Sequence, residues 1–195
     1  MENTARSQRT RDAAIQAALT IIARDGPSKL TIDAIARESG ISKGGVLHQF
    51  RTKEAVLKAV LEHQITTSEA FFQDFLGKIS PSQSEPILEA QIATLRAAAA
   101  HPQSTTFALA GVLAEAPDLL ALVREMDARR VEDIKDQASD PNIALVRWAA
   151  AKGLALAAIL GQCPLSGEER DRLFECLQND KRWAELCRSA APVNI

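Results

Sequence analysis

The segment from Thr31 to Lys53 reads TIDAIARESGISKGGVLHQFRTK. Thr31 and Ser42 each stand where a hydroxyl is preferred as a helix N-cap, which predicts helices over 32–39 and 43–50. Gly40 lies between them, where a glycine ends a helix most easily. Two helices joined by a tight turn that contains glycine form a helix-turn-helix pattern.

Within this pattern the small Ala36 stands where the two helices must approach each other. Ile35, Val46 and Phe50 are the apolar residues of a shared core. The remaining polar side chains of the second helix are then free to face outward. In a helix-turn-helix the second helix enters the major groove of DNA and its first residues meet the base edges.

In the rest of the chain, proline, glycine and helix-capping residues mark the ends of a series of predicted helices. The expected helices are 7–24, 53–76, 85–100, 105–115, 117–137, 141–162 and 167–178, with a short one over 181–189. No strand pattern or internal repeat is found, so the fold class is all-α. We expect a DNA-binding domain over 1–53, a bridging helix over 53–76, and a helical ligand-binding and dimerisation domain over 77–195.

The charge distribution supports two functions in one chain. The 195 residues carry a net charge of −2. Residues 1–53 hold 9 Lys+Arg and 5 Asp+Glu, whereas residues 54–195 hold 14 and 20. Arg6, Arg9 and Arg11 are expected to form a basic arm before the first helix, which either follows DNA phosphates or is a solvated tail.

The compartment is predicted from what the sequence contains. The first residues are polar and rich in arginine, unlike a secretory signal, and the longest uncharged apolar stretch, 153–163, is short of the roughly 20 residues of a membrane span. Three cysteines form no CxxC pair, which favours reduced thiols over a disulfide framework or a metal site. We expect a cytoplasmic protein without cofactor or membrane; a redox-active cysteine is the alternative.

The stretch from Ser7 to Leu61 resembles the DNA-binding domain of TetR-family transcriptional regulators. The resemblance is carried by Gly26, Thr31, Ile35-Ala36, Gly40-Ile41-Ser42-Lys43-Gly44, Phe50 and Lys53. It implies phosphate contacts from Thr31 and Lys53. The DNA-contacting residues of the second helix would be Ser42, Lys43, Gly44, Gly45, His48 and Gln49. The family commonly has a tyrosine near Leu47 or His48, and because this sequence has no tyrosine, His48 is the ring that could replace it.

Gly44 and Gly45 are unusual because two glycines in the first turn of a helix cost about 1 kcal/mol each against alanine. They either let the backbone approach DNA closely or relax a tight helix start.

The helix over 141–162, apolar on nearly all sides, is the best dimerisation candidate together with the helix after it. The resemblance implies the same, since TetR-family dimers usually pair their last two helices. The expected interface residues are Leu156, Ile159, Leu160, Leu173, Phe174 and Leu177; core packing within one chain is the alternative.

The family also implies an effector pocket in the second domain, lined here by Phe71, Phe75, Leu95, Phe107, Met126 and Trp148, or else ordinary core. Gln91, Arg147 or Lys152 could anchor an effector, although long cationic side chains more often extend to solvent.

Taken together, the sequence predicts a ligand-responsive DNA-binding regulator. We expect a repressor that binds a pseudo-palindromic double-stranded DNA operator as a homodimer and is released by a small-molecule effector. A helical adaptor for protein partners, whose helix-turn-helix no longer recognises DNA, is the alternative. An enzyme is disfavoured because no nucleophile elbow, phosphate loop or metal-ligand spacing is present.

Overall fold

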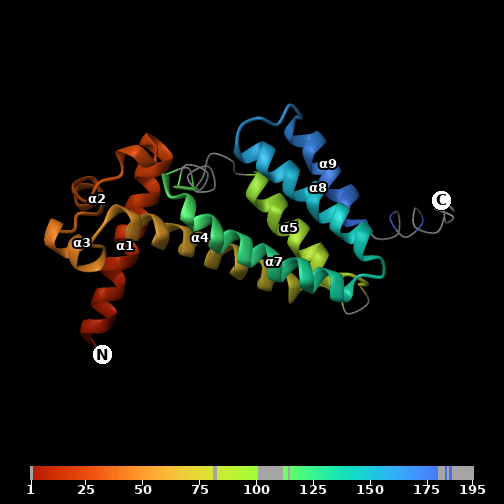
Figure 1. Cartoon of the computed structure of the whole chain (residues 1–195), viewed down its shortest axis with the longest axis horizontal. Helices are drawn as coiled ribbons and strands as arrows, with labels where there is room; N and C mark the ends of the chain where they lie inside the picture. Colours follow the sequence, from red (N-terminus) through yellow and green to blue (C-terminus); the bar gives the residue numbers. More distant parts are fainter. Residues whose placement is uncertain are drawn as a thin grey trace. The chain divides into compact units, whose positions relative to one another are not determined.

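The computed structural model describes residues 2–80, 83–100, 112, 113, 115–179, 183 and 185, with side chains from residue 4 onward. Within these residues the fold is helical and no strand occurs, which confirms the all-α class (Figure 1). The elements are α1 (Glu2–Asp25), the 3₁₀ turn η1 (Pro27–Lys29), α2 (Ile32–Ser39), α3 (Lys43–Gln49), α4 (Lys53–Leu76), α5 (Pro86–Ala100), the 3₁₀ turn η2 (Pro117–Leu119), α7 (Leu120–Gln137), α8 (Pro141–Ile159) and α9 (Gly167–Gln178).

The chain divides into two compact units. Unit 1 comprises Met1–Thr67 and Gln103–Leu122, and unit 2 comprises Ser68–Pro102 and Val123–Ile195. The expected helix over 105–115 and the expected short helix over 181–189 lie mostly outside the described residues.

The core of unit 1 forms around one face of α1, against which α2 and α3 pack. The five apolar residues that recur at helical spacing in α1 are all buried: Ala14, Ile15, Ala18, Leu19 and Ile22. Ile35 of α2 and Val46 of α3 complete this core together with Phe50. The core predicted for the helix-turn-helix is therefore confirmed.

Helix α1 begins at Glu2, earlier than predicted. Arg6, Arg9 and Arg11 consequently lie inside the helix, and the prediction of a basic arm before it is wrong. The segment ENTARSQRTR has no glycine or proline and is rich in residues with good helix propensity. Arg11 in addition lies over the ring of Phe50, with 4.8 Å from its guanidinium carbon to the ring centroid.

The predicted caps determine the bounds of α2 and α3. The hydroxyl of Thr31 accepts a hydrogen bond from the backbone N–H of Ala34 at 3.0 Å, and that of Ser42 accepts one from Gly45 at 3.1 Å. Gly40 ends α2 with φ 69°, in the left-handed region that glycine enters without steric cost.

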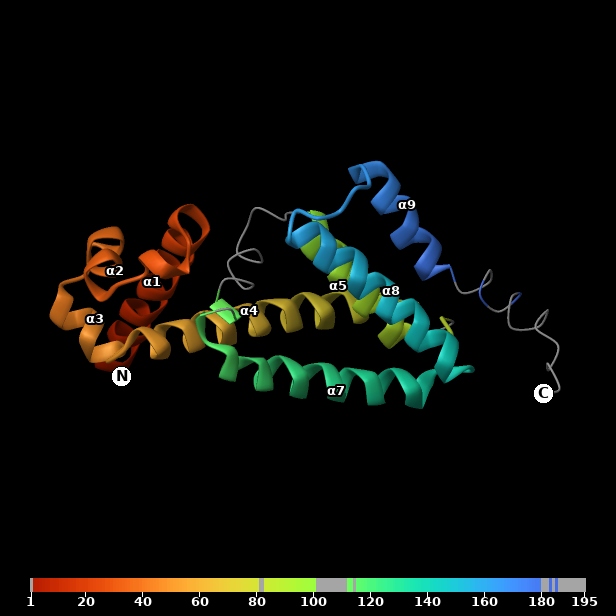
Figure 2. The same ribbon diagram turned by 45° about the horizontal axis from the view of Figure 1, so that its top comes forward.

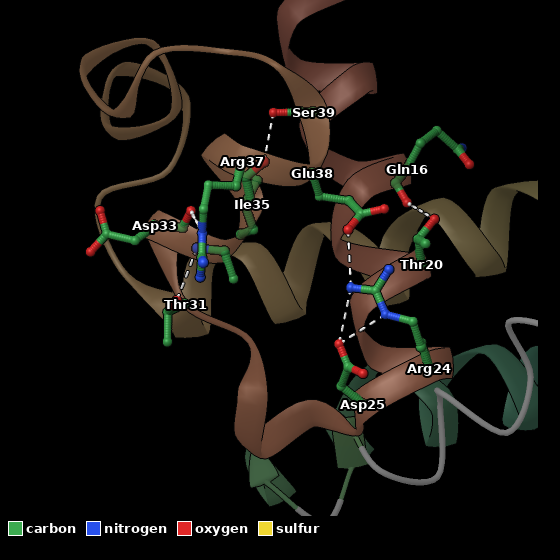
Figure 3. A network of polar contacts seen from close by, with 11 residues as sticks. Gln16, Thr20, Arg24, Asp25, Thr31, Asp33, Ile35, Arg37, Glu38 and Ser39 are labelled. Atoms are coloured by element: carbon green, nitrogen blue, oxygen red, sulfur yellow. Dashed lines mark hydrogen bonds and ion pairs between the residues drawn. The ribbon is translucent and has the colours of Figure 1, made fainter.

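A polar network joins the end of α1 to α2 (Figure 3). Arg24 donates hydrogen bonds to Asp25 at 3.1 Å and to Glu38 at 3.0 Å. The bond to the Asp25 side chain is the largest cause that raises the pKa of Arg24, followed by the bond to Glu38. All three side chains are partly exposed, so this network contributes more to the orientation of α2 than to stability.

The two glycines at the start of α3 differ in their surroundings. A Cβ atom added at Gly45 would lie 2.8 Å from the side-chain carbon Cγ2 of Ile41, whereas one added at Gly44 would meet nothing within 4 Å. Ile41 packs against the core of unit 1 and is β-branched, so it has little freedom to move away. Packing within the chain thus explains why residue 45 is a glycine, but it does not explain the glycine at residue 44.

Unit 2 is built on α5, α8 and α9, which lie side by side (Figure 2). Small residues of α8 face α5 and let the two helices approach closely: Ala144, Ala151 and Ala155 are buried. Leu88 and Ile92 of α5 fill the remaining space in this core. The predicted capping box of α9 is confirmed, since Ser166 and Glu169 bond each other's backbone N–H groups. These bonds from the side chain and backbone of Ser166 lower the pKa of Glu169.

Arg147 lies inside this core and does not extend to solvent, which corrects the sequence-based expectation for this residue. Its side chain is among the most fully buried of the described residues. It pairs with the buried carboxylate of Glu85 and donates a hydrogen bond to the backbone oxygen of Leu177 at 2.8 Å. One guanidinium therefore links α8 to the segment before α5 and to the end of α9.

Helix α8 ends at Ile159, earlier than the predicted Gln162, and Gly161 follows with φ 66°. By length and composition α8 is apolar enough to cross a membrane, which the shorter uncharged stretch in the sequence did not suggest. Core helices of folded domains meet the same criteria. One face of α8 packs on α5 and includes the buried Arg147, and 33% of its apolar window is buried.

The two glycines of α3 provide a matched pair of substitutions. We expect Gly44→Ala to raise the free energy of unfolding by up to about 1 kcal/mol through helix propensity. Gly45→Ala gains the same propensity but must displace Ile41, and we expect it to lower stability by about 1 kcal/mol. Urea denaturation of both variants measures the difference. Equal effects of the two substitutions would contradict the close contact at Gly45.

The buried ion pair in unit 2 predicts a large effect of a single charge change. Glu85→Gln leaves Arg147 buried without its carboxylate, which costs about 3–5 kcal/mol. The matched control is Asp74→Asn, which breaks an exposed pair with Lys78 and costs below about 1 kcal/mol. Denaturation curves compare the two variants. Similar small losses in both would show that the Glu85 pair does not stabilise the core.

Candidate nucleic-acid interface

Helix α3 presents one face to solvent and the other to the core of unit 1. The exposed residues are Lys43, Gly44, Leu47 and His48, and Ser42 is exposed directly before them. Val46 and Phe50 face inward. Four of the predicted DNA-contacting residues therefore share one accessible surface, which we call the exposed face of α3: Ser42, Lys43, Gly44 and His48.

Gln49 does not belong to this face. Its side-chain amide donates a hydrogen bond to the hydroxyl of Ser7 at 3.0 Å, in a partly buried position between α3 and α1. A hollow of about 370 Å³ opens beside this bond, lined by Arg6, Ser7, Thr10, Ile41, Ser42, Gly45, His48 and Gln49. The polar and cationic groups at its edge are of the kind that meets a DNA backbone. The structure thus places Gln49 where it orients α1 against α3, while its predicted contact with bases stays a prediction.

Both lysines predicted to contact DNA are engaged by carboxylates. The ammonium of Lys43 lies 2.9 Å from Asp33, and that of Lys53 lies 2.9 Å from Glu115. The first pair is largely exposed and its attraction is therefore weak. The second is only about one-third exposed on each side, so Lys53 is held more firmly. A phosphate that binds either lysine must share it with, or take it from, the carboxylate.

Thr31 lies at the start of α2, as predicted, and its hydroxyl oxygen caps the helix. The hydroxyl proton remains available as a donor, since the cap uses the oxygen only as an acceptor. Thr31 is exposed. A contact from Thr31 to phosphate is compatible with this geometry and stays a prediction.

The described residues predicted for the effector pocket all belong to unit 2. Leu95 and Trp148 pack against its core, whereas Phe71 is 42% exposed. The buried aromatic residue of this stretch is its neighbour Phe72, whose ring lies 3.4 Å from the guanidinium carbon of Arg130. Phe75 stacks on Phe71 at 6.4 Å between centroids. Met126 is partly buried on α7, and Phe107 lies outside the described residues.

Around Trp148 the structure brings two further polar groups together. The ammonium of Lys152 lies 5.0 Å from the Trp148 ring centroid and pairs with Asp127 of α7. The indole N–H of Trp148 is buried and has no hydrogen-bond partner among the described residues. A buried donor without an acceptor is costly, and a polar ligand would satisfy it.

The residues predicted for the dimer interface separate into two groups. Ile159, Phe174 and Leu177 are buried in the core of unit 2, which is the packing that the alternative describes. Leu156, Leu160 and Leu173 are exposed large apolar residues. Val146 is exposed as well and, with Ala149, Ala150 and Gly153, extends one continuous apolar face along α8.

Two residues that lie beside the predicted DNA contacts were given no role of their own by the sequence, Leu47 and Glu115. Leu47 is 40% exposed on the exposed face of α3, and an apolar residue among polar ones in a recognition helix was the available signal. Glu115 became relevant only through folding, because it is 62 residues away from Lys53 in sequence. In the described part of the chain no group of three metal-ligating side chains is found.

Comparison with known proteins agrees with this geometry. Residues 14–60 match the family model of bacterial regulatory proteins of the tetR family, and residues 85–181 match that of the tetracyclin repressor-like C-terminal domain. The chain is 34% identical over 106 residues to the regulator SrpR of Pseudomonas putida, a match that covers 54% of this chain and 47% of SrpR. It is 33% identical to the regulator TtgW of the same species, over 54% of this chain and 75% of TtgW. The match thus spans about half the length of SrpR.

Solved structures show the same fold. A transcriptional regulator from Streptomyces coelicolor superimposes with a TM-score of 0.66 at 22% identity, covering 87% of this chain and 96% of that one. A TetR-family regulator from Rhodococcus gives the same TM-score of 0.66 at 20% identity, over 87% and 97% of the two chains. Both family models and the TtgW match lead to one conclusion: this chain belongs to the TetR family of helix-turn-helix transcriptional regulators.

Proposed function

We propose that this regulator is a repressor that binds a pseudo-palindromic operator as a homodimer and is released by a small-molecule effector. The observation that carries the DNA-binding part is the exposed face of α3, which carries Lys43 and further polar positions and lies on a helix fixed by the core of unit 1. One such helix recognises few base pairs, so a pair of them, about one helical turn or 34–36 Å apart, is the usual route to specificity.

The apolar face of α8 supports dimerisation. Leu156 and Leu160 are 48% and 43% exposed on this face, and Leu173 of α9 is exposed as well. Contiguous exposed apolar side chains of this kind mark interfaces in proteins that are otherwise well packed. A second copy of the chain can present the same face about a two-fold axis.

The surroundings of Trp148 support an effector site in unit 2. The unsatisfied indole N–H, the Lys152–Asp127 pair and the aromatic ring are groups that could hold a polar or cationic aromatic ligand. A protein of the same fold, the multidrug binding protein EbrR, has been solved as a complex with ethidium (TM-score 0.58, 18% identity). Effector release would require that the ligand favours a conformation with weaker DNA binding, a coupling of typically 1–3 kcal/mol.

Selection of bound sequences from a random DNA pool tests the proposal as a whole. A homodimer with two α3 helices enriches inverted half-sites with a fixed separation. Enrichment of single, unpaired sites would contradict operator binding as a dimer, and no enrichment would favour the alternative of a protein-partner adaptor.

The contact between Lys53 and Glu115 predicts that a single neutral substitution strengthens DNA binding. Glu115→Gln removes the competing carboxylate, and we expect a two- to five-fold tighter Kd at low salt for operator and random DNA alike. Lys53→Ala should weaken binding to all sequences and reduce the slope of log K against log salt by about 1. Fluorescence anisotropy titrations measure both quantities.

The matched control is Glu62→Gln on α4, since Glu62 pairs with Lys58 at 3.8 Å and carries the same charge. In the Lys53→Ala background, Glu115→Gln should have little further effect. An equal gain from Glu62→Gln, or an undiminished gain without Lys53, would show that only overall charge is involved.

The apolar face of α8 predicts that one added charge dissociates the dimer. Leu156→Glu places a carboxylate in the desolvated centre of the interface, where an unpaired charge costs several kcal/mol, and we expect a monomer at micromolar concentration. Ala128→Glu, at an exposed position of α7, is the control and should leave the mass unchanged. Sedimentation equilibrium measures the mass. A wild-type monomer, or a dimeric Leu156→Glu variant, would contradict this interface.

A further inference from the structure

Leu47 is the one large apolar side chain on the exposed face of α3. It is 40% exposed and lies among Lys43, Gly44 and His48, so the other positions of this face are polar or glycine. It does not belong to the core, which Val46 and Phe50 supply from the opposite side of the helix. Leu47 therefore contributes apolar surface to the region that would enter the major groove.

The surroundings of Leu47 leave room for a base edge. Gly44 lies one turn before Leu47, and apart from its neighbours and the backbone of the helix itself, no atom lies within 4 Å of the place where its Cβ would stand. Gly45 is explained by its contact with Ile41. Gly44 is therefore the glycine whose missing side chain leaves space next to Leu47. The helix backbone can thus come near the floor of a groove at this point.

Two polar side chains of the same helix are engaged within the chain. Gln49 is bonded to Ser7, and Lys43 pairs with Asp33. A leucine has no hydrogen-bonding group, so it can distinguish bases only by an apolar contact. In the major groove the apolar group on a base edge is the C5-methyl of thymine.

We propose that Leu47 recognises thymine in each operator half-site through contact with its C5-methyl group. This inference rests on the proposed DNA-binding function and adds to it one base and the atom that is recognised. Burial of one methyl group against an apolar partner corresponds to about a four-fold difference in Kd per half-site. Uracil lacks this methyl and is otherwise identical in its pairing edge, so it separates the methyl contact from every polar contact.

The experiment uses the full-length protein and an operator obtained by random-pool selection. Each thymine of a half-site is replaced in turn by deoxyuridine, at the equivalent place in both half-sites, and Kd is measured by fluorescence anisotropy. For wild type we expect one position at which uracil weakens binding about fifteen-fold, as two methyl contacts are lost. In Leu47→Ala the same replacement should have no effect.

Two further variants make the outcome specific. Leu47→Met keeps an apolar side chain and should retain the loss at the same position, and His48→Ala should retain it as well. Because Leu47 is exposed, thermal unfolding of its variants should match wild type. The inference is overturned if no position distinguishes wild type from Leu47→Ala. If wild type selects no DNA at all, the proposed DNA-binding function fails, and this inference fails with it.

Discussion

The exposed face of α3 depends on one close contact, which α3 makes with the turn before it. Ile41 lies so near the first turn of α3 that a Cβ at Gly45 would be 2.8 Å from it. Ile41 is itself packed against the core of unit 1. This contact fixes the rotation of α3 about its axis, because Val46 must then face α1. The same rotation brings Leu47 and His48 to the outside.

The fold of unit 1 was predictable because its signals are local. A hydroxyl before a helix and a glycine after it act within a few residues, so the bounds of α2 and the start of α3 follow from the sequence. The pairings of the site were not predictable in this way. Gln49 meets Ser7 across 42 residues, and Lys53 meets Glu115 across 62. Such partners are selected by tertiary packing, which leaves no periodic pattern in the sequence.

In unit 2 the apolar composition of α8 indicated a helix that is buried on most sides. It did not indicate which face packs within the chain and which is exposed. Alanine and leucine occur all round it, so the inward face could be identified only from what α5 and α9 present. A similar ambiguity affected Phe71 and Phe72, which are adjacent and differ by about 100° around α4. The guanidinium of Arg130 lies against Phe72, and a partner from α7 could not be deduced from the local pattern. The burial of Arg147 was not predicted for the same reason, since the carboxylate that pairs with it belongs to Glu85, directly before α5.

The carboxylates beside Lys43 and Lys53 have a consequence for how the protein would search a chromosome. Non-specific affinity comes almost entirely from cations that meet phosphates. A surface that supplies its own anions offers fewer free cations to random DNA, so fewer molecules are held at the very large number of non-operator sites. For the function proposed above, the internal pairs at Asp33 and Glu115 would lower residence on arbitrary sequence, and recognition would depend more on the base edges. A regulator present in few copies would gain from this, because more of its molecules would remain free to reach the proposed operator.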